Sequence, residues 1–466
     1  MLDFKITSVS DVVYDKINMP SYSTLEDIPE VPSAIYQRRV EKFTTILKQQ
    51  GIDMALIYGD REHFQNFEYF FGIDIWFEEA IGIIHNDGRC FALLGNECYP
   101  LKSLMKINAI VYLCPVLSLP GQPQDEGISV IEGLKKSGLK KGNIIGCVGW
   151  KHFPNSDIFD TPEYILQDMR TIIGTSGKII NITKSLSGPG IGLRNYIEPE
   201  QAALFEYSSC VISDGMLDVF HNVKPDMREL DIAAYLNPKG LPLSCFTNVS
   251  SGYRTKTGLV SPSSKKIGLG EPITLCWAMR GALSCRSAFV AHDSKDLPLA
   301  DRDYMDSLVK PYFATAVTWL ENMRIGMSGE ELYNLVSTIF PKEAYGWTLN
   351  PGHFLSMEEW INSPVFEGSK YVFESGNALQ LDIIPNYRGH LTCNIEDGIL
   401  LADESYRKKL EEEYPKMWRR ILQRKKFLKE ELGIKIRDEV LPLYDTQGIL
   451  NPYLLNKGYA MKKRSN

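Results

Sequence analysis

The sequence lacks the segments that would take it into or across a membrane. It has no run of about 18 apolar residues, the length that a membrane-spanning helix needs. Its opening stretch, MLDFKITSVSDVVYDKINMP, has neither the basic head nor the apolar core of a signal peptide. Positive charge is not in excess, because 51 Lys and Arg face 58 Asp and Glu, which gives a net charge of -7. We therefore expect a cytoplasmic protein that binds a small molecule and neither nucleic acid nor a membrane.

Paired cysteine motifs are also missing. The chain has nine cysteines, an odd number, and none forms a CxxC pair. This pattern fits reduced thiols better than a disulfide framework, and it excludes a zinc ribbon. What the chain does have is 466 residues, of which 44% are hydrophobic, enough for two or three well-packed domains.

The first half of the chain alternates helical and strand patterns. After an N-terminal arm, residues 1–35, the segment AIYQRRVEKFTTILKQQGI predicts an amphipathic helix that ends at Gly51. Strands are predicted at MALIYG, AIGIIHNDGRCFALLG, INAIVYLCPV and NIIGCVGW. Residues 36–190 are therefore predicted to form an α/β domain.

A second domain is predicted for residues 191–402, after the Gly-rich and Ser-rich stretch SLSGPGIGLRN. A long helix should begin at Glu198, Pro199 and Glu200, since carboxylates favour the positive end of a helix and proline needs no donor there. The pattern of a long helix, a turn and a short helix occurs twice, ending in KPDMRELDIAAYL and in RIGMSGEELYNLVSTIF. This repetition indicates an internal duplication with strands between the copies.

The remaining segment, residues 403–466, is predicted to be a helical extension. Its sequence SYRKKLEEEYPKMWRRILQRKKFLKEELG alternates charges of both signs around apolar residues at helical spacing. We expect a solvated helix that packs one face on the body or on a partner subunit. The interleaved glutamates disfavour a nucleic-acid role.

Asp382 and Glu396 are the strongest candidates for a functional site. Each is a lone carboxylate in a short apolar run, LQLDIIPNYRG and NIEDGILLAD. Burying an ionised carboxylate is costly unless a metal, a cation or a strong donor meets it. Two such residues on adjacent strands therefore predict a site, with a solvated strand face as the alternative.

Residues 36–402 resemble the creatinase, aminopeptidase P and prolidase superfamily. The resemblance rests on EPEQAALF, KPDMRELDIAAYL, RIGMSGEEL, the PGH at 351–353, LQLDIIP and NIEDGILLAD, in that order. It implies an α/β N-terminal domain followed by an α+β C-terminal domain of the duplicated pita-bread type. It also implies a homodimer with shared pockets, in which Trp76 and Phe77 of NFEYFFGIDIWFEEA would wall the partner's site. Ordinary core positions are the alternative for these two aromatics.

The resemblance also shows what this chain has lost. Peptidases of the superfamily hold two divalent metals with two Asp, one His and two Glu, and a bridging water attacks the amide. His353, Asp382 and Glu396 fall at the positions of the His and the two Glu. Cys276 and Cys285 stand where the two Asp would be. The family's histidine is absent from the loop SSGYRTKTGLVSPSSKKI, and Trp360 occupies the position of the second His after PGH.

Charge balance disfavours a dinuclear centre. Two divalent ions bring four positive charges, and the site offers only two carboxylates. If Arg280 and Gly281 form a two-residue turn, Cys276 and Cys285 face each other across the ladder. One zinc or other divalent ion could then use both thiols, His353, Asp382 and Glu396. A packed thiol pair with no metal at all is the alternative that we favour.

Three functions remain open. The first is a C–N hydrolase that acts on a small amino-acid derivative, an amidino compound or a dipeptide, without the usual dinuclear metal centre. In it, His353 would be the general acid or base, with Asp382 and Glu396 orienting it or gripping a cationic group. Substrate-binding candidates are Trp360 and, for a carboxylate, Arg254, Lys256 and Arg286, although each basic residue could be a plain surface charge.

The second possible function is an Xaa-Pro aminopeptidase or dipeptidase with an unusual metal ligand set. The third is a catalytically inactive binding or scaffolding protein.

Overall fold

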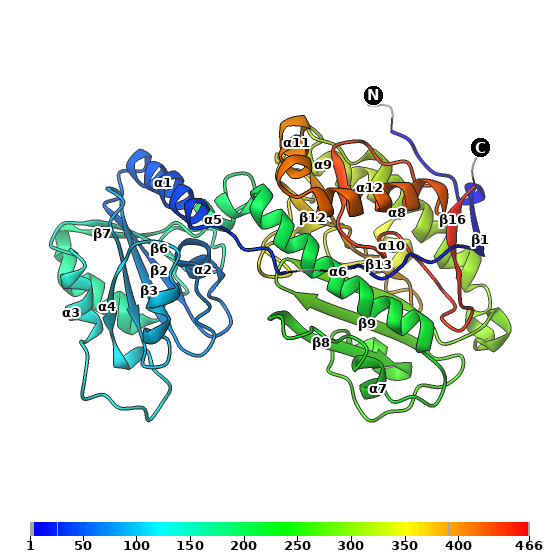
Figure 1. Cartoon of the computed structure of the whole chain (residues 1–466), viewed down its shortest axis with the longest axis horizontal. Coiled ribbons are helices and arrows are strands. Elements are labelled where there is room, and N and C mark those ends of the chain that lie inside the picture. The colour runs from blue at the N-terminus through cyan, green and yellow to red at the C-terminus, as the bar shows by residue number, and fades with distance from the viewer. Residues whose placement is uncertain (1–3, 26, 390–391, 465–466) are drawn as a thin grey trace. The chain divides into compact units, whose positions relative to one another are not determined.

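The computed structural model describes residues 4–25, 27–389 and 392–464, which form two compact units (Figure 1). One unit is Val31–Arg194. The other combines Met1–Glu30 with Asn195–Asn466. The N-terminal segment and the C-terminal segment thus belong to the same unit. No helix in the described part of the chain combines the length and the apolar character that crossing a bilayer requires.

The unit Val31–Arg194 is built around a six-stranded sheet in the order β5-β4-β3-β2-β6-β7. Its strands are β2 (Met54–Gly59), β3 (Ala80–His85), β4 (Cys90–Leu94), β5 (Ile110–Leu113), β6 (Ile144–Val148) and β7 (Lys178–Asn181). Its helices are α1 (Ser33–Gln49), α2 (Gln65–Phe71), α3 (Val130–Lys136), α4 (Glu163–Ile173) and α5 (Lys184–Ser187). Strands β2, β6 and β7 are parallel, while β3 is antiparallel to both of its neighbours.

Both faces of strand β2 pack against hydrophobic clusters, so the sheet is covered on both sides at this strand. Ala55 and Ile57 belong to the hydrophobic cluster that contains Phe43 of α1. Leu56, on the opposite face, belongs to the cluster that contains Leu134 of α3. Because side chains alternate along a strand, a strand covered on both faces reads as a continuous apolar run, as MALIYG does. The predicted α/β domain is confirmed.

The larger unit has two four-stranded sheets. The first has the order β13-β10-β9-β8, and the second has the order β11-β12-β14-β15. The strands of the first are β8 (Leu243–Ser251), β9 (Pro272–Met279), β10 (Ala282–Phe289) and β13 (Asn394–Glu396). Those of the second are β11 (His353–Phe354), β12 (Ala378–Gln380), β14 (Gly398–Leu401) and β15 (Val440–Pro442). The segments β1 (Val12–Lys16) and β16 (Tyr459–Lys463) form a separate antiparallel pair.

The predicted duplication is visible in the helices. The long helix α6 (Pro199–Asn222) is followed by α7 (Glu229–Ala233), and the long helix α8 (Lys310–Asn322) by α9 (Gly329–Ile339). Helix α9 starts with a capping box, in which Ser328 accepts a hydrogen bond from the Glu331 amide and the Glu331 carboxylate accepts one from the Ser328 amide. The remaining helices are α10 (Lys342–Tyr345), α11 (Glu404–Glu413) and α12 (Pro415–Glu430).

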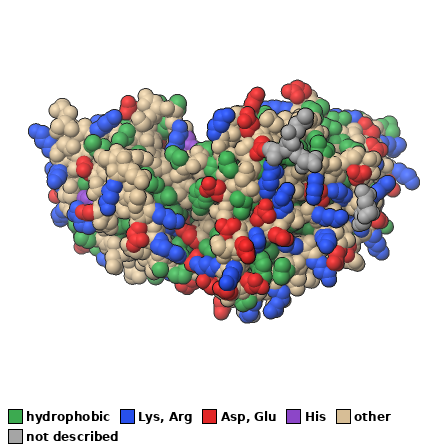
Figure 2. Space-filling view, turned by 90° about the horizontal axis from the view of Figure 1, so that it is seen from above, with side chains coloured by type: hydrophobic (Ala, Val, Ile, Leu, Met, Phe, Trp, Pro, Cys, Tyr) green, Lys and Arg blue, Asp and Glu red, His purple; other side chains and the backbone are tan. Residues whose placement is uncertain are grey.

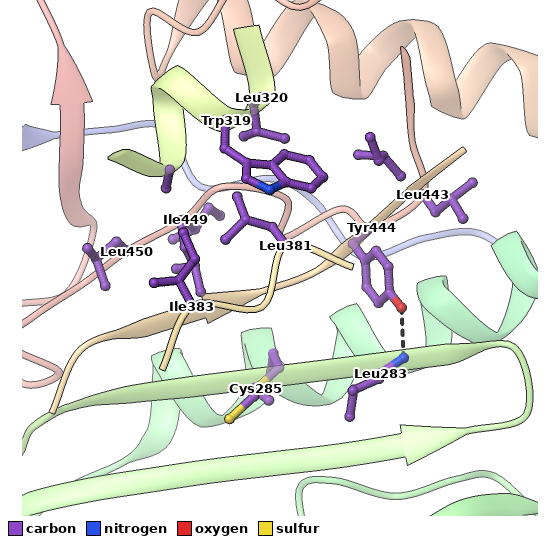
Figure 3. Close-up of a cluster of buried hydrophobic side chains, with 14 of the residues drawn as sticks. Leu283, Cys285, Trp319, Leu320, Leu381, Ile383, Leu443, Tyr444, Ile449 and Leu450 are labelled. Atoms are coloured by element: carbon purple, nitrogen blue, oxygen red, sulfur yellow. Dashed lines mark hydrogen bonds between the residues drawn. The ribbon is translucent and has the colours of Figure 1, made fainter. Parts of the chain in front are cut away.

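Helix α6 is buried along most of its length and packs on β9 and β10. Gly215 allows the close approach, because a Cβ at this position would lie 2.5 Å from the Trp277 ring. Trp277 therefore faces α6, and its neighbour Cys276 points to the other side of the sheet. In the core between the two sheets, the Tyr444 hydroxyl accepts a hydrogen bond of 2.7 Å from the Leu283 amide (Figure 3).

The hairpin β9–β10 has the predicted register. Met279 pairs with Ala282, so Arg280 and Gly281 form the two-residue turn. Gly281 adopts a φ of +80°, a left-handed conformation that glycine reaches without steric cost. Cys276 consequently lies directly opposite Cys285, as the sequence predicted.

Candidate active site

Three titratable side chains meet between the two sheets of the larger unit. His353 lies in β11, Asp382 follows β12, and Glu396 ends β13. One possible ligand atom of each residue lies within 4.8 Å of those of the other two. Their exposed fractions are 1%, 2% and 4%. The structure therefore brings together the three residues that the sequence predicted as the catalytic set, and they are called the triad below.

The hydrogen bonds of His353 define which nitrogen is basic. Nδ1 lies 3.1 Å from the carbonyl oxygen of Phe354, and Nε2 lies 3.3 Å from Oε1 of Glu396. Because a carbonyl only accepts, Nδ1 carries the proton of the neutral ring. Nε2 then turns its lone pair toward Glu396, whose protonated carboxyl group can donate to it.

The protonation states of His353 and Glu396 fit this arrangement. Burial lowers the pKa of His353, although the nearby Asp382 opposes the shift. Burial, assisted by Asp397, raises the pKa of Glu396 to about 8, while Arg286 opposes this rise. A neutral imidazole and a protonated carboxyl group therefore face each other near neutral pH.

Asp382 is the member of the triad without a hydrogen-bond partner. Its Oδ1 is buried and receives no hydrogen bond from any described residue. Burial first, and then the proximity of Glu396, raise its pKa well above the ordinary value. A buried, unpartnered carboxyl oxygen beside a second acid is the arrangement that an incoming cation or donor would stabilise.

The titration of Glu396 gives a testable dependence of stability on pH. Its folded pKa, about 8, lies above the unfolded value of 4.5, so the folded state binds more protons between these pH values. This contribution is fully present below pH 4.5 and is lost as the pH rises to about 8, at roughly 1.4 kcal/mol per pH unit. We expect Glu396→Gln to flatten the pH dependence of the unfolding free energy. Denaturant unfolding of both proteins at several pH values, with a chelator present, measures it; parallel curves would contradict the shifted pKa.

Trp360 covers the imidazole. Its ring stacks on His353 with centroids 4.2 Å apart and an angle of 22° between the planes. The tryptophan is 38% exposed and His353 only 1%, so the indole lies at the surface beside a buried histidine. Trp360 is placed to contact a substrate that reaches His353, and this role stays a prediction.

Cys276 and Cys285 lie opposite each other beside the triad. Cys285 pairs with Cys276 on one side and with Glu396 on the other. A hydrogen bond with Cys285, together with burial, raises the pKa of Cys276 well above its ordinary value. Neither thiol belongs to the group of ligand atoms that the structure brings within 4.8 Å in the described chain. The candidate set for one metal is thereby reduced to His353, Asp382 and Glu396.

Arg286 is engaged inside the protein. It is 3% exposed, and its Nη2 donates to Oδ2 of Asp397 at 2.5 Å and to the carbonyl of Thr446 at 3.0 Å. Nη1 donates to the carbonyl of Cys285 at 2.9 Å. These contacts tie β10 to the end of β13. The predicted role of Arg286 in binding a substrate carboxylate has no support from this geometry and stays a prediction.

The other basic candidates lie in the segment after β8. Arg254 pairs through Nε with Oε2 of the buried Glu229 at 3.1 Å and donates from Nη2 to the carbonyl of Ser261 at 2.7 Å. Lys256 is exposed. Their roles in substrate binding also stay predictions.

Trp76 and Phe77 belong to the other unit, in the loop after α2. They are 60% and 62% exposed, so they are not core residues of the chain. This exposure agrees with an aromatic loop that is available to a partner, and the partner itself stays a prediction.

Asp397 is the residue that the sequence reasoning missed. It follows Glu396 directly and therefore points to the opposite face of the strand. Besides Arg286, it accepts a hydrogen bond of 2.9 Å from the Ser284 hydroxyl. It also helps to raise the pKa of Glu396. The sequence signal for Asp397 is the adjacent pair of acids in NIEDGILLAD, in which the prediction used only Glu396.

Comparisons with known proteins identify the fold. No family model and no curated protein matches the sequence. Solved structures do match. An Xaa-Pro dipeptidase from Bacillus anthracis has a TM-score of 0.60 and 15% identity, covering 79% of this chain and 96% of that one. A prolidase from Pyrococcus horikoshii has a TM-score of 0.61 and 14% identity, covering 78% and 95%.

A third match is an Escherichia coli aminopeptidase P variant in complex with substrate, with a TM-score of 0.56 and 14% identity, covering 80% of this chain and 93% of that one. Each of these structures aligns with this chain over nearly its own whole length. The chain therefore has the fold of the creatinase, aminopeptidase P and prolidase superfamily, an α/β N-terminal domain followed by an α+β pita-bread domain, as its motifs predicted.

Proposed function

We propose that this chain hydrolyses a C–N bond in a small amino-acid derivative, an amidino compound or a dipeptide, at the triad. The observation that carries the proposal is the convergence of three buried titratable groups, one of which, Asp382, has an unpartnered oxygen. Perturbed titratable groups that converge on one point are typical of catalytic sites. The neighbouring folds bear the names Xaa-Pro dipeptidase, prolidase and aminopeptidase P, which makes a dipeptide a natural first substrate.

The protonation states supply an acid and a base without a metal. Substrate entry would break the hydrogen bond between Glu396 and Nε2 of His353, and Nε2 then accepts a proton from water as the water oxygen bonds to the carbonyl or amidinium carbon. The protonated Glu396 gives its proton to the leaving nitrogen as the C–N bond breaks. The free oxygen of Asp382 receives the ammonium or amidinium group of the substrate, whose positive charge lowers the raised pKa of this carboxyl group and favours its ionised form.

The triad also fits one divalent cation. His353, Asp382 and Glu396 offer one imidazole nitrogen and two carboxyl groups, which lose their protons when an ion binds, so that two negative charges balance one such ion. When bound, the ion would polarise the scissile carbonyl and activate a water molecule. A second ion would lack its carboxylate ligands, because Cys276 and Cys285 stand at the positions of the missing carboxylates, and a hydrogen bond with Cys285 together with burial raises the pKa of Cys276.

A binding protein without turnover is the second candidate. The observation that favours it is the burial of the triad, at most 4% exposed, beneath the stacked Trp360. The family's loop histidine is also absent. In this case the pita-bread domain would bind a peptide and leave it intact. The homodimer, and the place of Trp76 and Phe77 at the partner's pocket, are kept as proposals from the family resemblance.

A substrate panel separates these functions. Xaa-Pro dipeptides, creatine and related guanidino acids are incubated with protein purified without chelators, before and after treatment with EDTA. We expect hydrolysis of at least one compound. Turnover that survives EDTA supports the metal-free acid–base pair, and turnover that is lost supports a single ion at the triad. Binding of these compounds without any hydrolysis would contradict the proposal and support the binding protein.

A further inference from the structure

A cavity of about 540 Å³ lies in the larger unit, away from the elements that carry the triad. One wall is the N-terminal segment 20–24, which supplies the side chains of Ser21, Tyr22, Ser23 and Thr24. The other wall is α12, with Asp445 at one side. Its volume falls in the range of small-molecule sites. No function proposed above uses this cavity.

The α12 wall is strongly basic. Lys416, Arg419, Arg420, Gln423 and Arg424 line the cavity, and their spacing of three and four residues places them on one face of the helix. The glutamates of α11 and α12 do not share this lining. Figure 2, which looks at the molecule from above the view of Figure 1, shows Lys and Arg side chains spread over this unit with Asp and Glu among them.

Two of the arginines are held in place from behind. Glu206 of α6 is 1% exposed, and its Oε1 accepts a hydrogen bond of 2.8 Å from Nε of Arg420 and lies 2.7 Å from Nη1 of Arg424. Nε of Arg424 donates to Oδ1 of Asp445 at 2.7 Å. Arg424 itself is 4% exposed. Arg420 and Arg424 are therefore fixed before any ligand arrives, which reduces the conformational entropy that binding would cost at these two side chains.

The buried carboxylates do not balance the arginines. Glu206 and Asp445 bring two negative charges, and Asp218 at the Tyr22 hydroxyl brings a third, against the four cationic side chains of Lys416, Arg419, Arg420 and Arg424, which leaves one positive charge in excess. Arg419 is exposed, and no described carboxylate forms an ion pair with it. Arg420 directs Nε and Nη2 to Glu206. Its Nη1 forms no hydrogen bond or ion pair with a described residue.

The opposite wall adds hydrogen-bond donors and an aromatic surface. The hydroxyl of Ser23 donates to Asp445, which fixes the segment against α12. Ser21 and Thr24 are exposed at the rim. Tyr22 is 46% exposed, and Phe427 of α12 also lines the cavity. Guanidinium groups and hydroxyls suit anionic oxygens, and the two rings suit a flat apolar group.

We propose that this cavity binds a phosphorylated small molecule of nucleotide size, with its phosphoryl oxygens on Arg419, Arg420 and Lys416. The guanidinium group of Arg419 can donate to two phosphoryl oxygens at once, Nη1 of Arg420 adds a further donor, and the volume exceeds what a lone phosphate would fill. The ligand would also bridge segment 20–24 and α12, so binding stabilises the contact between the N-terminal segment and the body of the unit.

The test is calorimetric titration of the full chain with ATP, pyrophosphate and citrate at constant salt. The variant Lys416→Ala/Arg419→Ala removes two cations of the lining, and Lys426→Ala/Lys429→Ala removes two cations of the same helix that do not line the cavity. All four side chains are exposed, so both variants should fold. We expect wild type and the control to bind ATP and pyrophosphate with dissociation constants within about twofold of each other. The lining variant should bind at least about tenfold more weakly, as loss of charge-assisted hydrogen bonds implies.

Three outcomes would overturn the proposal. The first is wild type that binds neither ATP nor pyrophosphate. The second is an equal loss of affinity in both variants, which would show a general charge effect. The third is citrate that binds as tightly as pyrophosphate, which would assign the cavity to polycarboxylates.

Discussion

Replacing His353 by alanine is expected to abolish hydrolysis of any substrate found in the panel without unfolding the chain. Nε2 of His353 is the basic nitrogen of the triad, because Nδ1 is committed to the carbonyl of Phe354. Loss of a general base lowers kcat by about 10²- to 10⁴-fold. The rate constants of wild type and variant on the same substrate measure the effect, and the far-ultraviolet circular dichroism spectrum checks the fold.

His292→Ala is the matched control for this experiment. His292 pairs with Asp296 on the surface, where its side chain is 66% exposed, and it should not affect turnover. Equal activity in wild type and His353→Ala would show that the triad is not the catalytic site. A fall that is shared by His292→Ala would point to a general loss of fold and not to catalysis.

Replacing Asp397 by alanine is expected to cost the largest amount of stability among the changes considered, about 3–5 kcal/mol in the free energy of unfolding. The reason is that Arg286 and Asp397 are both buried, with side chains 3% and 1% exposed. Removing the carboxylate leaves a guanidinium charge in the core with no ionic partner. Urea unfolding followed by tryptophan fluorescence measures the loss.

Two further variants make this result specific. Asp87→Ala breaks the exposed pair between Asp87 and Arg89, whose side chains are 51% and 59% exposed, and it should cost no more than about 1 kcal/mol. The double change Arg286→Leu/Asp397→Leu removes both charges and should recover part of the stability. An Asp397→Ala variant as stable as wild type would contradict the structural role assigned to this pair.

Local chemistry made several parts of the structure predictable. The two-residue turn at Arg280 and Gly281 fixed the register of its hairpin, and with it the opposition of Cys276 and Cys285. The apolar run MALIYG predicted the strand β2, which the structure places at Met54–Gly59. Lone acids in apolar strands predicted buried carboxylates at positions 382 and 396, and the structure buries both.

Pairings between distant segments could not be predicted in this way. Nothing in the local pattern joins β1 to β16, which lie at opposite ends of the chain. The stacking of Trp360 on His353 depends on how an irregular segment returns to β11. The local sequence around Arg286 does not reveal its ionic partner, because Asp397 lies 111 residues away along the chain. The sequence therefore left Arg286 as a candidate for substrate binding. Propensity and spacing describe neighbours in sequence, and these contacts arise from tertiary packing.

The proposed function depends on the absence of a second metal position. The triad offers two carboxyl groups and one imidazole, which suffice to hold and neutralise one divalent ion. We therefore expect the acid–base pair of His353 and Glu396 to act alone or with a single ion.

The number of metal ions per chain tests this claim most directly. Protein purified without chelators is saturated with manganese, zinc or cobalt, desalted, and analysed by elemental mass spectrometry and by native mass spectrometry. We predict at most one ion per chain, lost in the variant Asp382→Asn. Two tightly held ions per chain, with one retained when Cys276 and Cys285 are replaced by serine, would contradict the account.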